Sequence, residues 1–334
     1  MAITTRFGVT LAGSAGYNLV EAAVAEAREA AESGVDSVWM GQRLDYDAVG
    51  LAGIVGTRVP GIDVGVSAVP VFGRHPLLVS SQAQTAQAAT GGRFQLAVAL
   101  GAPPIVEQAF GLAWERPVAR LREFLTVLGP LLRGEAVEHE GELITARSLL
   151  PTHVPGARRT PLLVAAMAPK ALRVTGELAD GTVPYLAGPK ALAEHIIPAI
   201  TAAAEAAGRP APRIVALVPA AVTTDAQAHD KMAEGLSFYT QFESYRRVLA
   251  LNDTENPVDL ALIGDEDHVA KGLRQYAEAG ATEIVLTAHH DLDAATQSRT
   301  RRLAGELAKS VRSPSLSVAS SYWEDSGGAV STPR

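Results

Sequence analysis

Five polar side chains stand just beyond short apolar runs of the sequence: Gln42, Arg43, Tyr17, Tyr185 and His289. An arginine can pair with a substrate carboxylate or with an anionic cofactor, while tyrosine and histidine can donate a proton to a substrate carbanion. These five are the candidate catalytic residues. A surface ion pair would be an equally ordinary role for Arg43, because Asp45 and Asp47 follow it closely.

Several other kinds of chemistry lack the residues that they need. The chain has no cysteine, which excludes disulfides, thiolate metal sites and a cysteine nucleophile. Its eight histidines are dispersed and no carboxylates are grouped with them, so we expect no metal site. The nucleophile pattern G-x-S-x-G is also missing. The apolar runs instead end in glycine, alanine and small polar groups, which suits a bound cofactor that brings its own chemistry.

The composition indicates a globular protein without a nucleic-acid or membrane partner. Hydrophobic residues make up 47% of the 334 residues, and the formal net charge is -7. Lysine and arginine are scattered, whereas surfaces that bind nucleic acid or anionic lipid rely on basic patches. No apolar run approaches the roughly 18 residues of a membrane span, and no signal peptide is recognisable. We therefore expect a cytoplasmic protein.

Apolar runs and helical segments alternate along the chain, and these elements must position the candidate residues. The expected strands cover residues 6–11, 37–40, 62–69, 94–100, 162–166, 181–185, 213–222 and 283–288. The expected helices cover residues 19–33, 47–58, 76–89, 117–132, 169–179, 189–207, 265–279 and 297–310. Residues 136–145 predict a hairpin, and residues 225–251 predict a long helical insertion.

This alternation favours a closed α/β barrel, the (β/α)8 TIM barrel, over a doubly wound open sheet. A doubly wound dinucleotide fold would carry G-x-G-x-x-G after its first strand, whereas residues 12–16 read AGSAG. We expect a single domain over residues 1–311, followed by a Ser/Pro/Gly-rich tail over residues 312–334. In such a barrel the reactive site lies at the carboxyl ends of the strands.

Six short motifs follow one another along the chain: Arg74-His75-Pro76, Gly91-Gly92-Arg93-Phe94, Glu115-Arg116-Pro117, residues 121–125 (LREFL), residues 176–181 (GELADG) and residues 206–210 (AAGRP). In this order and at these spacings they resemble the luciferase-like monooxygenase superfamily. More specifically, they resemble the branch that uses the deazaflavin coenzyme F420. The resemblance covers residues 3–308.

The resemblance implies coenzyme F420 as the cofactor, with FMN as the alternative. It also implies a non-prolyl cis peptide at Val66–Ser67 or at the neighbouring bond, behind the cofactor ring. The loop after the fourth strand would line the ring and side chain of the cofactor. Backbone N–H groups after the fifth strand would hold its phosphate at the start of a helix. The implied cofactor-binding residues are Gln42, Val66, Ser67, Leu100, Gly101, Ala102, Ala166, Met167 and Ala168.

Two departures from the family pattern affect the chemistry. Gln42 and Arg43 stand where the sugar-phosphate dehydrogenase relatives carry Asp-His. Ala102, Pro103 and Pro104 stand where many closer relatives have a Ser-His pair. The acid and base residues of those relatives therefore cannot be transferred to this chain.

The resemblance implies an oxidoreductase. We expect a reductase that moves hydride from reduced coenzyme F420 to an activated C=C or C=N bond of a small or peptide-like substrate. An FMN-dependent monooxygenase and a non-catalytic, cofactor-binding barrel are the alternatives. Phe238, Tyr239, Phe242 and Tyr245 of the insertion are expected to cover the site, with packing in the core as an equally ordinary role. Members of the superfamily are commonly dimers, so we expect a homodimer.

Overall fold

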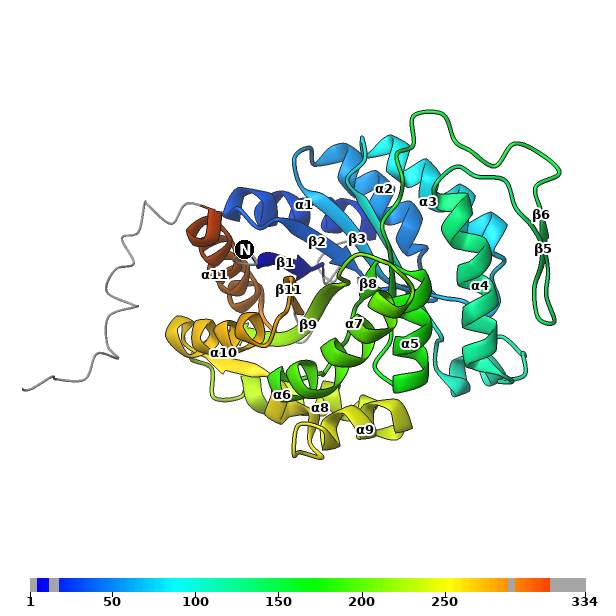
Figure 1. Cartoon of the computed structure of the whole chain (residues 1–334). Coiled ribbons are helices and arrows are strands. Elements are labelled where there is room, and N and C mark those ends of the chain that lie inside the picture. Colours follow the sequence, from blue (N-terminus) through cyan, green and yellow to red (C-terminus); the bar gives the residue numbers. More distant parts are fainter. Residues whose placement is uncertain (1–4, 12–17, 288–291, 313–334) are drawn as a thin grey trace, which may run out of the picture.

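The computed structural model describes residues 5–11, 18–287 and 292–312. Its barrel strands are β1 (Arg6–Thr10), β2 (Ser37–Met40), β3 (Asp63–Pro70), β4 (Phe94–Ala99), β7 (Leu162–Ala165), β8 (Gly181–Thr182), β9 (Arg213–Val222) and β11 (Glu283–Thr287). Neighbouring strands pair in parallel, and β8 closes the ring by pairing with both β7 and β9. This arrangement confirms the (β/α)8 TIM barrel expected from the sequence (Figure 1).

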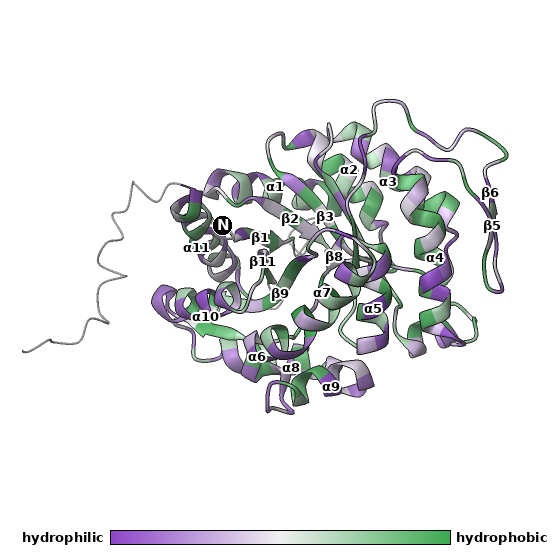
Figure 2. Cartoon of the chain, in the orientation of Figure 1, coloured by the Kyte–Doolittle hydropathy of each residue, from purple (hydrophilic) through white to green (hydrophobic). Residues whose placement is uncertain are grey.

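Helices cover the outside of the barrel (Figure 1). The α-helices are α1 (Leu19–Ser33), α2 (Ala48–Arg58), α3 (Pro76–Ala89), α4 (Pro117–Leu132), α5 (Pro169–Leu178), α6 (Pro189–Ala191), α7 (Ile197–Ala206), α8 (Ala228–Ser237), α9 (Glu243–Ala250), α10 (Glu266–Glu278) and α11 (Ala294–Arg312). Shorter helical segments are η1 (Ile105–Ala109), η2 (Leu192–Ile196), η3 (Phe238–Gln241) and η4 (Pro257–Leu260). Figure 2 shows hydrophobic strands at the centre and helices of mixed hydropathy around them, as amphipathic helices require.

Side-chain caps fix the helix ends. Asn18 Oδ1 accepts the backbone N–H of Val20 at 2.9 Å and caps α1, which Gly34 ends in the left-handed conformation with φ of 96°. His75 Nδ1 accepts the backbone N–H of Leu77 at 3.3 Å and caps α3. The side chain of His75 therefore belongs to the start of that helix.

Alternate strand residues point into the barrel and fill it in layers. The middle layer is built round Trp39, which is fully buried. Gly65 makes room for its ring, because a Cβ on Gly65 would lie 2.4 Å from it, whereas a Cβ on Gly8 would clash with Ser37. Other buried members of this layer are Ala97, Leu163, Val183, Val215 and Val285. Trp39 thus closes the barrel beneath the carboxyl ends of the strands.

A buried carboxylate stabilises the layer below. Glu283 is 1% exposed and accepts hydrogen bonds from Ser37 Oγ at 2.5 Å and from Trp39 Nε1 at 3.1 Å. Its other oxygen pairs with Arg213 at 2.8 Å. A buried carboxylate needs such partners to offset its desolvation. Ser37, Trp39 and Arg213 therefore hold Glu283 in place at the closed end of the barrel.

The expected hairpin is present as β5 (Glu138–Glu140) paired antiparallel with β6 (Thr145–Arg147), so it extends two residues further than predicted. The expected helix over residues 189–207 contains the π-helical segment η2 between α6 and α7. Pro198 has no backbone N–H to donate in the first turn of α7, which explains why the hydrogen-bond pattern changes there.

The expected helical insertion over residues 225–251 is present as α8, η3 and α9, and Phe242 between η3 and α9 is extended with φ of -99° and ψ of 127°. The sequence did not predict β10 (Leu262–Gly264), which pairs in parallel with the end of β9 outside the barrel ring. Together α8, η3 and α9 form a separate layer beside the barrel (Figure 1).

Candidate active site

A cavity of about 660 Å³ lies at the carboxyl ends of the strands. All eight barrel strands contribute to it, either with an inward-facing residue near the strand end or with a residue that follows the strand. These residues are Thr10, Gly41, Ser67, Ala68, Ala99, Ala165, Met167, Val183, Tyr185, Leu217 and Thr287. Most of them are small or apolar, and the cavity has the size of a typical cofactor or substrate site.

The end of β3 is irregular where it borders the cavity. Its register against β4 shifts between Val66 and Val69, and the peptide bond between Ser67 and Ala68 is cis. This is the bond next to Val66–Ser67, as the resemblance implied. Ser67 and Ala68 both line the cavity, whereas the Val66 side chain is fully buried in the core. The bulge brings two successive residues of one strand to the cavity wall.

The loop after β4 lies beside the cavity. Ala99, the last residue of the strand, lines it. Gly101 adopts a φ of 86°, which few other residues tolerate, and a Cβ there would be 3.5 Å from Val106. Leu100 packs against the core, and the Ala102 carbonyl accepts the Val106 N–H at 3.0 Å to begin η1. The three predicted residues thus form the turn, while the cavity wall itself is Ala99.

The loop after β7 leads from the cavity into α5. The backbone N–H of Ala166 donates to the Val164 carbonyl at 2.9 Å, and the Ala166 side chain is buried. Met167 lines the cavity, and Ala168 is the N-cap residue of α5. Pro169 follows at the first helical position. The N-terminus of α5, which is the positive end of its dipole, therefore faces this loop.

The two polar residues after β2 have different environments. The Gln42 side chain donates to the Tyr46 carbonyl at 2.8 Å and accepts from Ala48 N–H and Arg74, both at 3.2 Å. It therefore holds the loop together. Arg43 lines the cavity mouth, is 58% exposed, and forms a two-pronged ion pair with Asp45 at 2.9 Å. The surface ion pair considered for Arg43 is therefore present.

Aromatic residues of the insertion form the opposite wall. Phe238, Tyr239 and Tyr245 line the cavity, and Phe242 packs on Phe238 with ring centroids 5.1 Å apart. The rings of Tyr239 and Tyr245 meet edge to face at 4.8 Å. Phe238 remains 55% exposed at the rim. The insertion therefore covers the cavity with an aromatic surface, as expected for the lid.

Tyr185 brings a hydroxyl to this wall. Its ring meets that of Tyr239 edge to face with centroids 5.0 Å apart, and burial raises the pKa of Tyr185 well above the ordinary value of about 10. Tyr185 is therefore a neutral hydrogen-bond donor at physiological pH. The other two candidate catalytic residues with a transferable proton, Tyr17 and His289, lie outside the described residues.

Sequence reasoning missed the residues that line the cavity from within the strands, among them Thr10, Ala165 and Leu217. The period of two along each expected strand was the signal that could have found them, because the last inward-facing residue of each strand reaches the cavity floor. Tyr239 was named only as part of the lid, and its contact with Tyr185 depends on how the insertion folds back.

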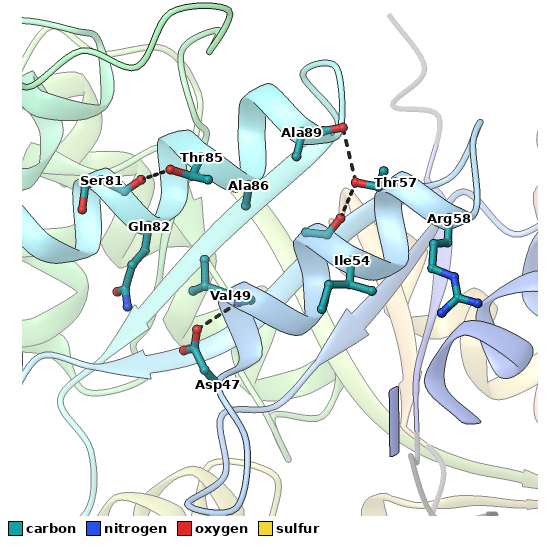
Figure 3. A pocket seen from close by; sticks show the side chains of 12 residues that line it. Asp47, Val49, Ile54, Thr57, Arg58, Ser81, Gln82, Thr85, Ala86 and Ala89 are labelled. Carbon is teal, nitrogen blue, oxygen red and sulfur yellow. Dashed lines mark hydrogen bonds between the residues drawn. The ribbon is translucent and has the colours of Figure 1, made fainter. Parts of the chain in front are cut away.

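A second, shallower pocket of about 560 Å³ lies on the outside of the barrel, between α2 and α3. Figure 3 shows Val49 and Ile54 on one helix and Gln82 and Ala86 on the other, along the same groove. Ile54 is 42% exposed, and the pocket is mostly apolar. It is formed by helix surfaces and shares no lining residue with the strand-end cavity.

The described part of the chain contains neither a metal-binding cluster nor a membrane-spanning helix. Across residues 5–11, 18–287 and 292–312, no group of three or more His, Asp or Glu side chains is placed to hold a metal ion. No helix within these residues combines the length and the apolar character needed to cross a bilayer.

The fold and the position of the cavity define a TIM-barrel protein with its site at the strand ends. The family model of the luciferase-like monooxygenases matches residues 1–283, and the chain belongs to this family.

The chain is also similar in sequence to individual proteins. The chain is 27% identical over 162 residues to a 5,10-methylenetetrahydromethanopterin reductase of Archaeoglobus fulgidus, a match that covers 48% of each chain. It is 27% identical over 314 residues to an F420-dependent glucose-6-phosphate dehydrogenase of Nakamurella multipartita, covering 83% of this chain and 88% of the relative. The chain thus spans about half the length of the first relative and most of the second.

A solved structure shows the same fold. The coenzyme F420-dependent tetrahydromethanopterin reductase of Methanopyrus kandleri superimposes with a TM-score of 0.74. The alignment covers 91% of this chain and 98% of that enzyme, at 19% sequence identity. At this identity the similarity establishes the shared fold.

Proposed function

We propose that this chain is a coenzyme F420-dependent oxidoreductase, and specifically a reductase of an activated C=C or C=N bond in a small or peptide-like substrate. The observation that carries the proposal is the two-sided cavity. Gly41, Ala68 and Ala99 form a wall of small residues against which a planar ring can lie, and aromatic residues of the insertion face it. The F420-dependent relative of Nakamurella multipartita supports the same cofactor.

The residues present fit such a cofactor. When bound, the reduced coenzyme supplies a hydride. Ser67 and Ala68 would border its ring, Gly101 allows the loop backbone to approach it closely, and Met167 and Ala168 would offer backbone N–H groups to its phosphate at the start of α5. The insertion excludes water from the acceptor.

The chain's own polar groups would serve the acceptor. Tyr185 would place a neutral hydroxyl donor in the cavity wall, where it can stabilise negative charge on the acceptor after hydride transfer. Arg43 at the mouth would attract anionic groups of cofactor or substrate. Tyr17 and His289 stay candidate proton donors, and Gln42 would act by holding the β2–α2 loop.

Cofactor titration tests this proposal. We expect the purified protein to bind coenzyme F420 with a micromolar or lower Kd, measured from the change in deazaflavin fluorescence, and to bind FMN at least tenfold more weakly. Tight binding of FMN without binding of F420 would contradict the reductase and support the monooxygenase alternative. A protein that binds F420 but never reoxidises it with any conjugated acceptor would support the non-catalytic alternative.

We also propose that residues 1–311 act as a single domain, that the protein is cytoplasmic, and that it forms a homodimer.

The α2–α3 groove supports the proposed homodimer. The exposed apolar residue Ile54 of α2 lines this groove, and a two-fold contact would pack the groove against the same groove of a second copy. Each of the two helices is long enough to contribute to an interface of ordinary size.

Replacing Ile54 by glutamate should convert the dimer into a monomer, because it would bury a charge at the centre of the contact. Light scattering coupled to size exclusion would show the mass fall from that of two chains to that of one. Leu149→Glu is the matched control, since Leu149 is 86% exposed on a loop far from the groove in sequence. A monomeric wild type, or a dimer that survives Ile54→Glu, would contradict the proposed face.

A further inference from the structure

Arg43 is the only charged residue among the described residues that line the strand-end cavity. Its guanidinium carbon lies 5.7 Å from the ring centroid of Tyr46, which also lines the cavity, so the cation sits at the cavity edge. A charged group of a ligand is costly to bury without a partner of opposite charge. The cavity therefore favours a ligand with an uncharged body and an anionic group at the end that faces Arg43.

The Asp45 carboxylate shows how the guanidinium of Arg43 can bind an anion. Nε and Nη2 of Arg43 donate to different oxygens of Asp45, both at 2.9 Å. This is the two-pronged geometry by which arginine binds carboxylates. Both side chains are more than half exposed, and exposed ion pairs contribute little to stability. A ligand carboxylate at the cavity mouth can therefore replace Asp45 on the same two N–H groups.

The backbone around this ion pair is held independently of it. The Tyr46 hydroxyl donates to the Gly41 carbonyl at 2.8 Å, and the Gln42 amide donates to the Tyr46 carbonyl at 2.8 Å. Asp47 begins α2 by accepting the Gly50 N–H at 3.0 Å. An exchange of partners by the guanidinium therefore requires a change of side-chain rotamers and no rearrangement of the loop.

The order of the strands indicates which ligand carries the anionic group. Arg43 follows β2, whereas α5 follows β7, and β3 and β4 lie between these two strands in the ring. The cofactor phosphate that we place at the start of α5 is thus three strand-to-strand steps of about 4.8 Å each from the side of Arg43. An anion bound by Arg43 therefore belongs to the acceptor, which shares the cavity with the cofactor.

We propose that Arg43 binds an anionic oxygen group of the acceptor, and that the acceptor is a planar, largely apolar compound with a carboxylate at its outer end. Asp45 is then a competing residue, because it pairs with Arg43 until the ligand carboxylate takes its place. Arg43 determines which acceptors bind, and Asp45 lowers their affinity. The inference rests on the proposed function and narrows its substrate class.

Two fluorescent probes that differ in charge test this site without any cofactor. 8-Anilinonaphthalene-1-sulfonate has an aromatic body and one anionic oxygen group, and N-phenyl-1-naphthylamine is the same body without that group. We expect Arg43→Gln to weaken sulfonate binding by about fivefold or more, because charge-assisted hydrogen bonds are lost, and to change binding of the neutral probe by less than about twofold. Asp45→Asn should strengthen sulfonate binding by about threefold, because the competing carboxylate is removed.

Glu135→Gln is the matched control for the removal of a carboxylate. Arg133 and Glu135 form the same kind of two-pronged pair two residues apart, at 2.7 and 2.9 Å, and neither residue lines the cavity. We expect both probes to bind this variant within about twofold of wild type, because exposed charges outside the cavity are screened. Ala165→Phe fills the cavity, and the binding that it abolishes is the binding compared among the variants.

Equal effects of Arg43→Gln on the two probes, or weaker sulfonate binding in Asp45→Asn, would overturn the proposal. So would the lack of any probe binding that Ala165→Phe abolishes. Titration with coenzyme F420 separates the inference from the proposed function. We expect its Kd in Arg43→Gln to stay within about threefold of wild type, whereas a loss of about tenfold would assign Arg43 to the cofactor and overturn the inference. The expected probe pattern in a protein that binds no F420 would overturn the proposed function but retain the anion site. Thermal unfolding checks that each variant is folded.

Discussion

Replacing Gly65 by alanine should lower the free energy of unfolding by about 3 kcal/mol, the upper part of the range for overpacked cores. The added Cβ would lie 2.4 Å from the Trp39 ring, which is fully buried and cannot retreat. The hydrogen bonds of Trp39 Nε1 to Ser37 and Glu283 hold the ring from the other side. Urea denaturation would measure the loss as a lower midpoint at an unchanged slope.

Gly129→Ala is the matched control for this prediction. Gly129 lies inside α4, and a Cβ there would be 3.7 Å or more from its neighbours. We expect a change of less than about 1 kcal/mol, because the preference for alanine over glycine within helices is opposed by contact between the new Cβ and the ring of Pro130. Trp39→Phe should couple with Gly65→Ala, since a smaller ring relieves the clash. A loss below about 1 kcal/mol for Gly65→Ala would contradict the placement of Trp39.

Replacing Ala165 by phenylalanine should weaken binding of the resident cofactor by about 100-fold or more, which corresponds to about 2.7 kcal/mol. Ala165 is the last residue of β7 and lines the cavity wall of small residues. A phenyl ring there would occupy the space in which we propose the planar ring lies. The fold should persist, because the new side chain points into open volume rather than into packed core.

Cofactor titration by fluorescence or absorbance would measure this effect, whichever of F420 and FMN the wild type binds. Ala202→Phe is the control, because Ala202 is exposed on α7 and its replacement should leave the Kd within twofold. Wild-type affinity in a folded Ala165→Phe variant would show that the cofactor does not use the strand-end cavity.

The barrel was predictable from the sequence because short, mostly apolar runs alternate with helical segments along the chain. The expected ends of β2, β3 and β9 agree with the structure to within one residue. β10 was not predictable in this way. It has three residues, all half-buried, and pairs only with the end of β9, so neither a long apolar run nor a clear alternation marks it.

The site was only partly predictable, because side-chain direction depends on local competition for hydrogen bonds. Gln42 follows a strand as a site residue should, yet the Tyr46 carbonyl and the Ala48 N–H use its amide. Arg43 pairs with Asp45, two residues away. The break at Phe242 was also hidden, since no glycine or proline marks it and its ring contacts, with Phe238 and Tyr245, lie within the insertion itself.

The separation between Trp39 and the insertion has a consequence for which parts of this protein can change independently. The interior layers that hold the barrel shut come from the strands, whereas most of the aromatic wall of the cavity comes from one contiguous stretch, α8 to α9. Substitutions in that stretch can reshape the acceptor side without touching the packing round Trp39. Substitutions in the insertion could therefore change which ligands the cavity accepts without loss of folding stability. The wall formed by Gly41, Ala68 and Ala99 is constrained, because larger side chains there would fill the space proposed for the planar ring.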